Sequence, residues 1–259
     1  MILSLLQLNI NADNFWDKLI PYLTKNDFDI LQFQEVCGEN TFSGNIHTKR
    51  DCYKELQKIL GDAYKSELAI AQTFSSNPSS FIGNATFYKK EFELIEKNIL
   101  PLYTRTTPFP SDLLNFEEAG RGVLHLKLNS NGKVISTLNA HCAWAKTPME
   151  QPHQTYQGEL LINYIKQVSS PFILSGDFNL DPEQPTIKKL STLARNLIKE
   201  NNITNTLNPR THGIKHLLAE GLEIAVDYIF TSNDLGVKEF SVIEEDLSDH
   251  LGLKATIEI

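Results

Sequence analysis

The chain has 259 residues, enough for one large α/β domain or two small ones. Its content of 41% hydrophobic and 22% charged residues is typical of a globular protein in water, and no apolar run approaches the roughly 20 residues that cross a bilayer. The net charge of −8 argues against tight, sequence-independent binding to long nucleic acid, which usually needs a basic face.

Periodicity predicts the secondary structure in chain order. Apolar and alternating runs predict strands over Leu3–Asn9, Asp29–Val36, Ala63–Thr73, Ala85–Tyr88, Phe92–Leu100, Arg121–Leu128, Lys133–Asn139, Pro171–Ser175, Ile224–Thr231, Val237–Val242 and Leu253–Ile259. Helical spacing predicts helices over Phe15–Leu23, Asp51–Leu60, His153–Val168 and Gln184–Lys199. Many strands with a few helices indicate one α/β domain, with two packed sheets and the helices outside.

Turns and loops separate these elements. Asn131-Gly132 between two alternating runs is a strong signal for a hairpin. Two long segments, Leu102–Ala119 and Asn201–Gly221, are polar or rich in proline and predict loops, which in a compact domain often carry function. We find no linker or repeat, and therefore expect a single domain over residues 1–259 that acts as a monomer.

The cysteines and the N-terminus bear on the compartment. The apolar first residues have no basic segment before them and no small-residue cleavage site after them, so they predict a first strand. Cys37, Cys52 and Cys142 are odd in number and lack the spacing of metal ligands. We therefore expect buried free thiols, a cytoplasmic location and no insertion into a membrane.

A carboxylate and a carboxamide lie just past the predicted strand Pro171–Ser175, in the stretch Gly176-Asp177-Phe178-Asn179. Side chains two apart in extended backbone share a face, so Asp177 and Asn179 can point at one object. Alternatively, the two side chains cap a turn and the next helix, which by itself carries no chemistry.

Further polar residues lie at or just past other predicted strand ends, namely Asn9 with Asn11, Glu35, His141, Asp227 and Asp249-His250. Each one alone could be a turn former, a surface group or a buried polar residue with its hydrogen bonds satisfied. Together they provide oxygen ligands without thiolates, which suit Mg²⁺ or Mn²⁺. Histidine beside carboxylates suits proton transfer and the stabilisation of phosphate, so the set indicates metal-assisted hydrolysis of a phosphate ester.

Four motifs in this order resemble the endonuclease/exonuclease/phosphatase superfamily: Gln34-Glu35, Gly176-Asp177-Phe178-Asn179, Asp227-Tyr228-Ile229-Phe230 and Ser248-Asp249-His250. The resemblance extends from Asn9 to His250 and is specific for the superfamily, but not for any member of it. It implies a four-layer α/β/β/α sandwich of two packed mixed sheets with flanking helices. It also implies a divalent metal, usually Mg²⁺, with Mn²⁺ as an alternative.

The resemblance also implies residue roles. Glu35 is the central metal ligand with Asn9 beside it, and Asp249 approaches the metal directly or through water. Asp177 activates the attacking water, and Asn179 helps to hold the phosphate.

For the remaining motif residues, His250 contacts the phosphate oxygen that gains charge, and Asp227 holds its ring. His141 contacts phosphate, and Arg121 is the basic residue that some members place nearby. A carboxylate beside His250 favours its charged form, which is the better hydrogen-bond donor.

The chain departs from the family pattern at two positions. Asn11 stands where some members have an aspartate, which removes a charge from the metal side, and Cys142 replaces the usual leucine. The insertions with which abasic-site nucleases hold bent DNA are not found. Asn11, Arg105 and Arg210 are candidates for contacting substrate, because the latter two lie in the long loops.

Three functions stay open from the sequence. The first is a phosphoesterase acting on the ends of DNA or RNA or on short nucleotides. The second applies the same chemistry to a small phosphorylated metabolite or a phospholipid headgroup, which the acidic charge favours. The third is a non-catalytic binding module, against which the full set of catalytic positions argues.

Overall fold

Two β-sheets of six strands each form the centre of the molecule, a computed structural model that describes all of residues 1–259 except 40–41, 44–45, 75–78, 105–117, 148 and 170. The first sheet has the spatial order β13 (Gly236–Ile243), β14 (Gly252–Glu258), β1 (Ile2–Asn9), β2 (Ile30–Cys37), β6 (Phe81–Lys89) and β5 (Tyr64–Thr73). The second has the order β11 (Arg195–Asn196), β12 (Asp227–Thr231), β10 (Phe172–Asp177), β9 (Lys133–His141), β8 (Arg121–Ser130) and β7 (Glu93–Tyr103).

Both sheets are mixed in the same way. In each, one parallel pair lies at the centre, β1 with β2 and β9 with β10, and the other pairings are antiparallel. A separate two-stranded ribbon joins β3 (Phe42–Ser43) and β4 (Ile46–His47). The hairpin predicted between β8 and β9 is confirmed, since Asn131 and Gly132 have φ of 53° and 81°, as the tight turn requires.

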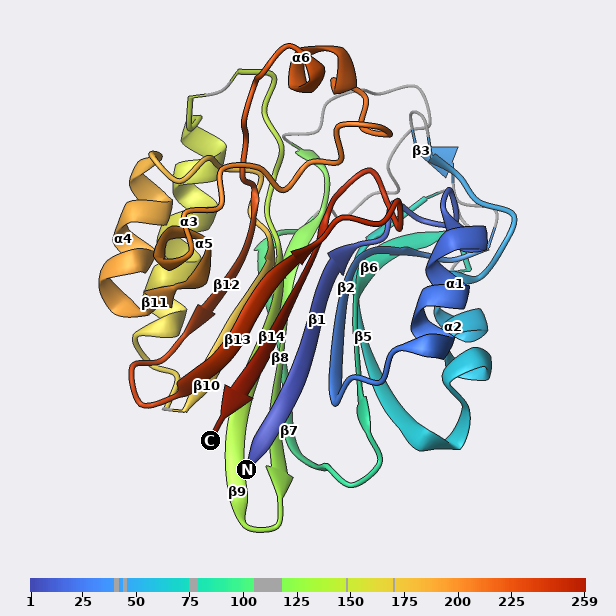
Figure 1. Ribbon diagram of the computed structural model, residues 1–259, viewed down its shortest axis with the longest axis vertical. Helices are drawn as coiled ribbons and strands as arrows, with labels where there is room; N and C mark the ends of the chain where they lie inside the picture. Colours follow the sequence, from blue (N-terminus) through green and yellow to red (C-terminus); the bar gives the residue numbers. More distant parts are fainter. Residues whose placement is uncertain (40–41, 44–45, 75–78, 105–117, 148, 170) are drawn as a thin grey trace.

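Helices cover the outer faces of the two sheets (Figure 1). Helices α1 (Trp16–Lys25) and α2 (Cys52–Leu60) lie outside the first sheet, and α3 (Pro152–Ile165), α4 (Pro185–Leu193) and α5 (Leu197–Glu200) lie outside the second. A short turn, η1 (Gly61–Ala63), follows α2, and α6 (Lys215–Ala219) lies beyond the ends of the sheets. The predicted four-layer α/β/β/α sandwich is thereby confirmed.

The inner face of each central strand changes from apolar to polar along its length. On β1, Leu3 and Leu5 belong to the core between the sheets, whereas Gln7 and Asn9 continue the same face as buried polar groups. The outward-facing residues of β1, such as Leu6 and Leu8, instead pack with α1 in a second core. Strands β2, β9 and β10 repeat this change, so one end of the space between the sheets is polar.

Hydrogen bonds between the sheets satisfy these polar groups. Gln34 Nε2 of the first sheet donates to Asn139 Oδ1 of the second at 2.7 Å, and Asn139 Nδ2 donates back to the carbonyls of Phe33 and Ala85. Nearby, Gln32 Nε2 donates to Thr137 Oγ1, and Ser175 Oγ donates to Gln32 Oε1. We call these bonds the polar seam. Because hydrogen bonds are directional, the seam fixes how the two sheets are placed against each other.

One predicted helix is wrong. The sequence predicted a continuous helix over Gln184–Lys199, but α4 ends at Leu193 and α5 begins only at Leu197. Between them Arg195 and Asn196 pair with β12 as the edge strand β11, and the Asn196 side chain then caps α5. Pairing with a sheet edge therefore overrides the helical spacing, because it satisfies backbone groups of β12.

Expectations about the cysteines, one strand and one loop segment have clear outcomes in the described residues. All three cysteines are buried and free, as predicted. The predicted strand Ile224–Thr231 begins only at Asp227, and the segment predicted as irregular over Asn201–Gly221 contains the short helix α6. No helix among the described residues has both the length and the apolar character needed to cross a membrane.

The fold makes Gly176 irreplaceable. Its φ is 148°, and a Cβ placed there would lie 1.9 Å from the carbonyl oxygen of Ala140 on the neighbouring strand. We expect Gly176→Ala to lower the free energy of unfolding by roughly 3 kcal/mol or more, because the clash is with backbone that cannot move aside. Urea denaturation measures this, with Gly213→Ala as the control, since nothing lies within 4 Å of a Cβ there. Equal stability of the two variants would contradict the prediction.

Candidate active site

Three of the predicted site residues lie in one row across the second sheet. Asp177 is the last residue of β10, and it pairs with His141 on β9 and with Asp227 on β12. Side chains of residues directly opposite each other point to the same face, which here is the face toward the first sheet. The register therefore places His141, Asp177 and Asp227 side by side at the polar end of the space between the sheets.

Asp177 is the centre of this group. Its Oδ2 accepts a hydrogen bond of 3.0 Å from Asn9 Nδ2 of the first sheet. The Nε2 atoms of His141 and His250 lie 3.6 Å and 3.9 Å from the same oxygen. The carboxylate is almost fully buried, with 1% of Asp177 exposed. Residues from both sheets and from the chain before β14 thus converge on one oxygen atom.

Glu35 reaches the site through an irregularity of β2. The register between β2 and β6 shifts between Phe33 and Val36, so two residues of β2 oppose one of β6, which is a β-bulge. Glu35 lies in the bulge with φ of 55°, a left-handed conformation that costs on the order of 1–3 kcal/mol for a residue other than glycine. The bulge turns its carboxylate toward His141, with 4.0 Å between Glu35 Oε1 and His141 Nε2.

His250 is held by a buried carboxylate. Its Nδ1 lies 2.9 Å from Asp227 Oδ2, while its Nε2 faces Asp177. The other oxygen of Asp227 accepts a hydrogen bond of 3.0 Å from Gln7 Nε2, which also donates to Gln34 Oε1 at 2.9 Å. The polar seam therefore extends through Gln7 to Asp227, and it fixes the orientation of the His250 ring.

Asn179 and Arg121 meet at the carbonyl of Cys142. Asn179 Nδ2 donates to this oxygen at 3.0 Å and Arg121 Nε at 3.1 Å. Asn179 has φ of 51°, so it does not continue the extended backbone that the sequence suggested, and its N–H donates to Asp177 Oδ1. The interpretation of this stretch as a turn and its interpretation as part of a site are thus both partly right, because a turn stabilised by Asp177 brings Asn179 beside the other site residues.

Electrostatics separates the two histidines. Burial, followed by the charges of Arg121 and His250, lowers the pKa of His141 well below its usual value. Burial also acts to lower the pKa of His250, but the carboxylates of Asp227 and Asp177 outweigh it and raise that pKa well above its usual value. Near neutral pH the site therefore pairs a neutral His141 with a charged His250.

The pKa values of two carboxylates, Asp177 and Glu35, are also shifted. Burial, more than the charge of Asp227, raises the pKa of Asp177 to about 7, although His250 opposes the rise. Burial and then the charge of Asp249 raise the pKa of Glu35. Glu35 and Asp249 are thus close enough to repel each other, and a cation between them would relieve this repulsion.

The oxygen donors around Glu35 fit a hard divalent cation. Glu35 and Asp249 offer carboxylate oxygens, and Asn9 offers its Oδ1, which accepts the N–H of Asn11. Oxygen donors without thiolates are typical of Mg²⁺ and Mn²⁺ sites. The tightest groups of ligand atoms in the described residues are Asp177–Asp227–His250 and His212–Asp249–His250, and neither includes Glu35. Assignment of the metal to Asn9, Glu35 and Asp249 therefore stays a prediction.

The predicted substrate contacts are not all brought to this group. Asn11 lies next to it, but its side-chain oxygen accepts a hydrogen bond from Asn14. Arg210 is half exposed, and its guanidinium is held by Asp246 and by the carbonyl of Glu244. Arg105 lies outside the described residues. Arg121 is buried beside the carboxylates, close enough to Glu35 and Asp177 to interact with their charges.

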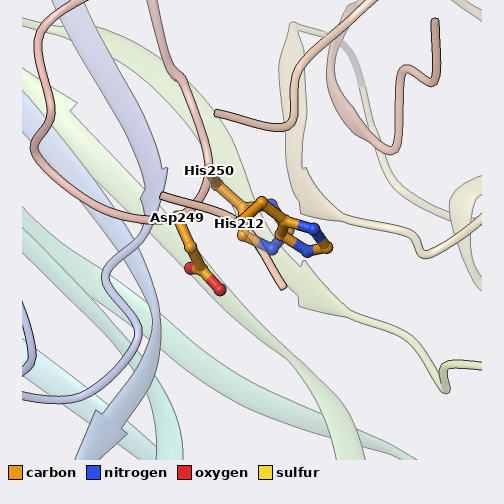
Figure 2. Close-up of side chains that lie close together, drawn as sticks. All are labelled: His212, Asp249 and His250. Atoms are coloured by element: carbon orange, nitrogen blue, oxygen red, sulfur yellow. The ribbon is translucent and has the colours of Figure 1, made fainter. Parts of the chain in front are cut away.

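Two residues of the site were missed by the sequence reasoning. Gln7 could have been found, because it lies two residues before Asn9 and therefore on the same face of β1. His212 could not, because it belongs to an irregular segment with no periodicity. It lies against His250 with the ring centroids 5.8 Å apart, and Figure 2 shows both rings beside the carboxylate of Asp249. Burial and then the charge of His250 lower the pKa of His212.

Comparison with known proteins places the chain among proteins of this architecture. A family model described as the endonuclease/exonuclease/phosphatase family matches residues 6–250. No curated protein sequence matches the chain.

Solved structures share the fold at low identity. A mannosyl-6-phosphatase from Bacteroides thetaiotaomicron is 17% identical with a TM-score of 0.73, covering 99% of this chain and 100% of that one. Humanised TDP2 of D. rerio is 17% identical with a TM-score of 0.71, covering 100% and 99% of the two chains. The catalytic domain of human Nocturnin, with bound sulfate, is 17% identical with a TM-score of 0.67, covering 99% and 93%. At such identities these similarities establish the fold alone.

Gln7 supports the site through two hydrogen bonds, and its loss should be measurable. We expect Gln7→Leu to lower the free energy of unfolding by roughly 2–4 kcal/mol, because Asp227 Oδ1 and Gln34 Oε1 are then buried without these donors. Urea denaturation in EDTA measures the change. Gln57→Leu is the control, since Gln57 is exposed and should change stability by less than about 0.5 kcal/mol. A Gln7→Leu protein as stable as the control would show that the seam does not support Asp227.

Proposed function

Because the chain belongs to the endonuclease/exonuclease/phosphatase family, we propose that it is a divalent-metal-dependent phosphoesterase in which Asp177 activates the attacking water. The observation that carries this proposal is the convergence on Asp177 Oδ2 of Asn9, His141 and His250, which come from three separate parts of the chain. A buried carboxylate held by fixed donors keeps one orientation, which general-base catalysis on a bound water requires.

The two histidines and Arg121 complete the phosphate site in this proposal. His250, charged and held by Asp227, donates from Nε2 to a phosphate oxygen that gains negative charge during the reaction. Arg121 contributes a fixed positive charge, because its guanidinium is buried and oriented by the carbonyls of Gly120 and Cys142. His141 is neutral and can donate or accept one further hydrogen bond.

Glu35, Asn9 and Asp249 are the residues that would hold the divalent ion, Mg²⁺ or Mn²⁺. The repulsion between Glu35 and Asp249 supports this assignment, since two carboxylates without a cation raise each other's energy. The bound ion would supply a Lewis acid that neutralises charge on the phosphate. The left-handed backbone of Glu35 also supports a functional role, because such strain persists where the surrounding structure and the function require it.

A small phosphorylated molecule is the substrate class that we favour. The chain carries a net charge of −8, and the basic side chain at the site, Arg121, is buried rather than part of an exposed basic channel. By its name, one structural relative is a phosphatase of a mannosyl phosphate. A monomeric enzyme of the cytoplasm that hydrolyses a small phosphate ester is consistent with the composition.

Removal of the Asp177 carboxylate tests the chemistry. We expect Asp177→Asn to lower kcat/KM by roughly 100- to 10,000-fold, because the amide cannot accept the proton of the attacking water. The assay uses a p-nitrophenyl phosphate monoester, bis-p-nitrophenyl phosphate and labelled single-stranded DNA, each with Mg²⁺, with Mn²⁺ and with EDTA.

The control for this assay is Asp234→Asn, which removes an exposed carboxylate and should leave turnover unchanged. Near-native turnover by Asp177→Asn would show that another group activates the water. Absence of turnover by the wild-type protein with every ester and metal would favour a binding module. Hydrolysis of DNA that falls steeply with added salt would identify a nuclease instead of a small-molecule phosphoesterase.

The Asp227–His250 pair gives a second test that separates orientation from metal binding. We expect Asp227→Asn to lower kcat roughly 10- to 100-fold, because His250 loses a charge-assisted hydrogen bond that favours its donor form. The affinity for Mn²⁺, measured by calorimetry, should stay within about threefold, because Asp227 is hydrogen-bonded to His250 and neither residue is among the proposed metal ligands. A large loss of Mn²⁺ affinity would place Asp227 among the metal ligands.

A further inference from the structure

His212 is a third imidazole at the site to which neither the motifs nor the comparisons assign a role. One ring nitrogen of His212, one of His250 and a carboxylate oxygen of Asp249 lie within 4.8 Å of one another (Figure 2). The rings of His212 and His250 meet edge to face, with an angle of 80° between their planes. His212 is partly exposed, whereas His250 is buried. His212 therefore lies on the solvent side of this group, and His250 lies on its buried side.

A backbone hydrogen bond fixes the form of the His212 ring. The N–H of Ile214 donates to its Nδ1 at 3.2 Å. A nitrogen that accepts a hydrogen bond carries no proton, so the proton of the neutral ring is on Nε2. Among the hydrogen bonds of the described residues, none uses Nε2 of His212. This N–H is therefore a donor with a defined direction, ready for a ligand.

The same bond argues against His212 as a metal ligand. Coordination through Nε2 would require a lone pair there, while Nδ1 already uses its own lone pair for the N–H of Ile214. Metal-bound histidines instead donate their second N–H to an acceptor. A fixed N–H donor beside the Nε2 of His250 suits a hydrogen-bond acceptor such as an anion, and under the proposed function this anion is the phosphate of a substrate.

The segment that carries His212 is hydrogen-bonded to the chain on both sides of His250. Asn208 N donates to the carbonyl of Asp249, and Leu251 N donates to that of Thr206, so the chain on both sides of His250 is joined to this segment. Leu207, Leu218 and Val226 form a small core of their own beneath α6. This local core and the backbone pairing hold the segment that carries His212 against the chain around His250.

We propose that His212 is a substrate-contacting residue, whose Nε2–H donates a hydrogen bond to a phosphate oxygen bound between His250 and Asp249. This inference rests on the proposed function, because it takes a phosphate as the ligand. In it, His250 contacts the phosphate from the buried side and His212 from the exposed side. His212 therefore lies where the phosphate group joins the part of the substrate that extends toward solvent.

Two variants of His212 separate the donor from the ring. We expect His212→Phe, which keeps an aromatic ring against His250 but has no donor, to lower kcat/KM and the affinity for inorganic phosphate roughly 10- to 100-fold. His212→Gln keeps an N–H near the position of Nε2 and should lose less than about fivefold in both. Phosphate binding is measured by calorimetry with Mg²⁺ present, and turnover with the p-nitrophenyl esters.

The matched control is His216→Phe, which changes an exposed histidine on α6 of the same segment and should leave both quantities unchanged. Equal effects of His212→Phe and His212→Gln, or none from either, would overturn the inference. A loss of Mn²⁺ affinity in His212→Phe would also overturn it, in favour of a ligand role. If the wild-type protein turns over no ester, the proposed function fails, and the phosphate measurement alone still decides the role of His212.

Discussion

The pairing of β9, β10 and β12 is the constraint on which the site depends. Because His141, Asp177 and Asp227 are direct neighbours across these strands, their relative positions follow from backbone hydrogen bonds rather than from flexible loops. A slip of one residue in either pairing would turn a member of the row to the opposite face of the sheet. The candidate active site is therefore as rigid as the sheet, and the first sheet needs only to dock correctly for Asn9 to reach Asp177.

Docking depends in turn on the polar seam. Gln7, Gln32, Gln34 and Asn139 are fully buried, and each is hydrogen-bonded across or along the space between the sheets. Each such bond contributes only about 1 kcal/mol net, but an unpaired partner costs more than that. The apolar half of the interface supplies the free energy that holds the sheets together, and the polar half selects their relative placement. The candidate active site lies at the polar end, where these directional hydrogen bonds fix the alignment of the two sheets.

Much of this could be predicted from sequence, for identifiable reasons. The strands and their polar ends were predictable because the inner faces alternate with a period of two. The motifs around Glu35, Asp177, Asp227 and His250 pointed to residues that the structure brings close together. The end of helix α4 before Ala194 could not be predicted, because Arg195 and Asn196 leave the helix in order to pair with the edge of β12. Likewise, His212 reaches the site through pairing between two irregular segments, and no local pattern encodes such a pairing.

The division of the sheet interface into an apolar and a polar half also has a consequence for folding. A chain that collapses with its two sheets rotated or shifted buries nearly the same hydrocarbon surface, yet leaves several amide side chains without partners. Such compact alternatives lie well above the native state in free energy. The buried glutamines and asparagines therefore disfavour collapsed states in which the two sheets are misaligned. The same few side chains that align the candidate active site therefore also favour a unique native state.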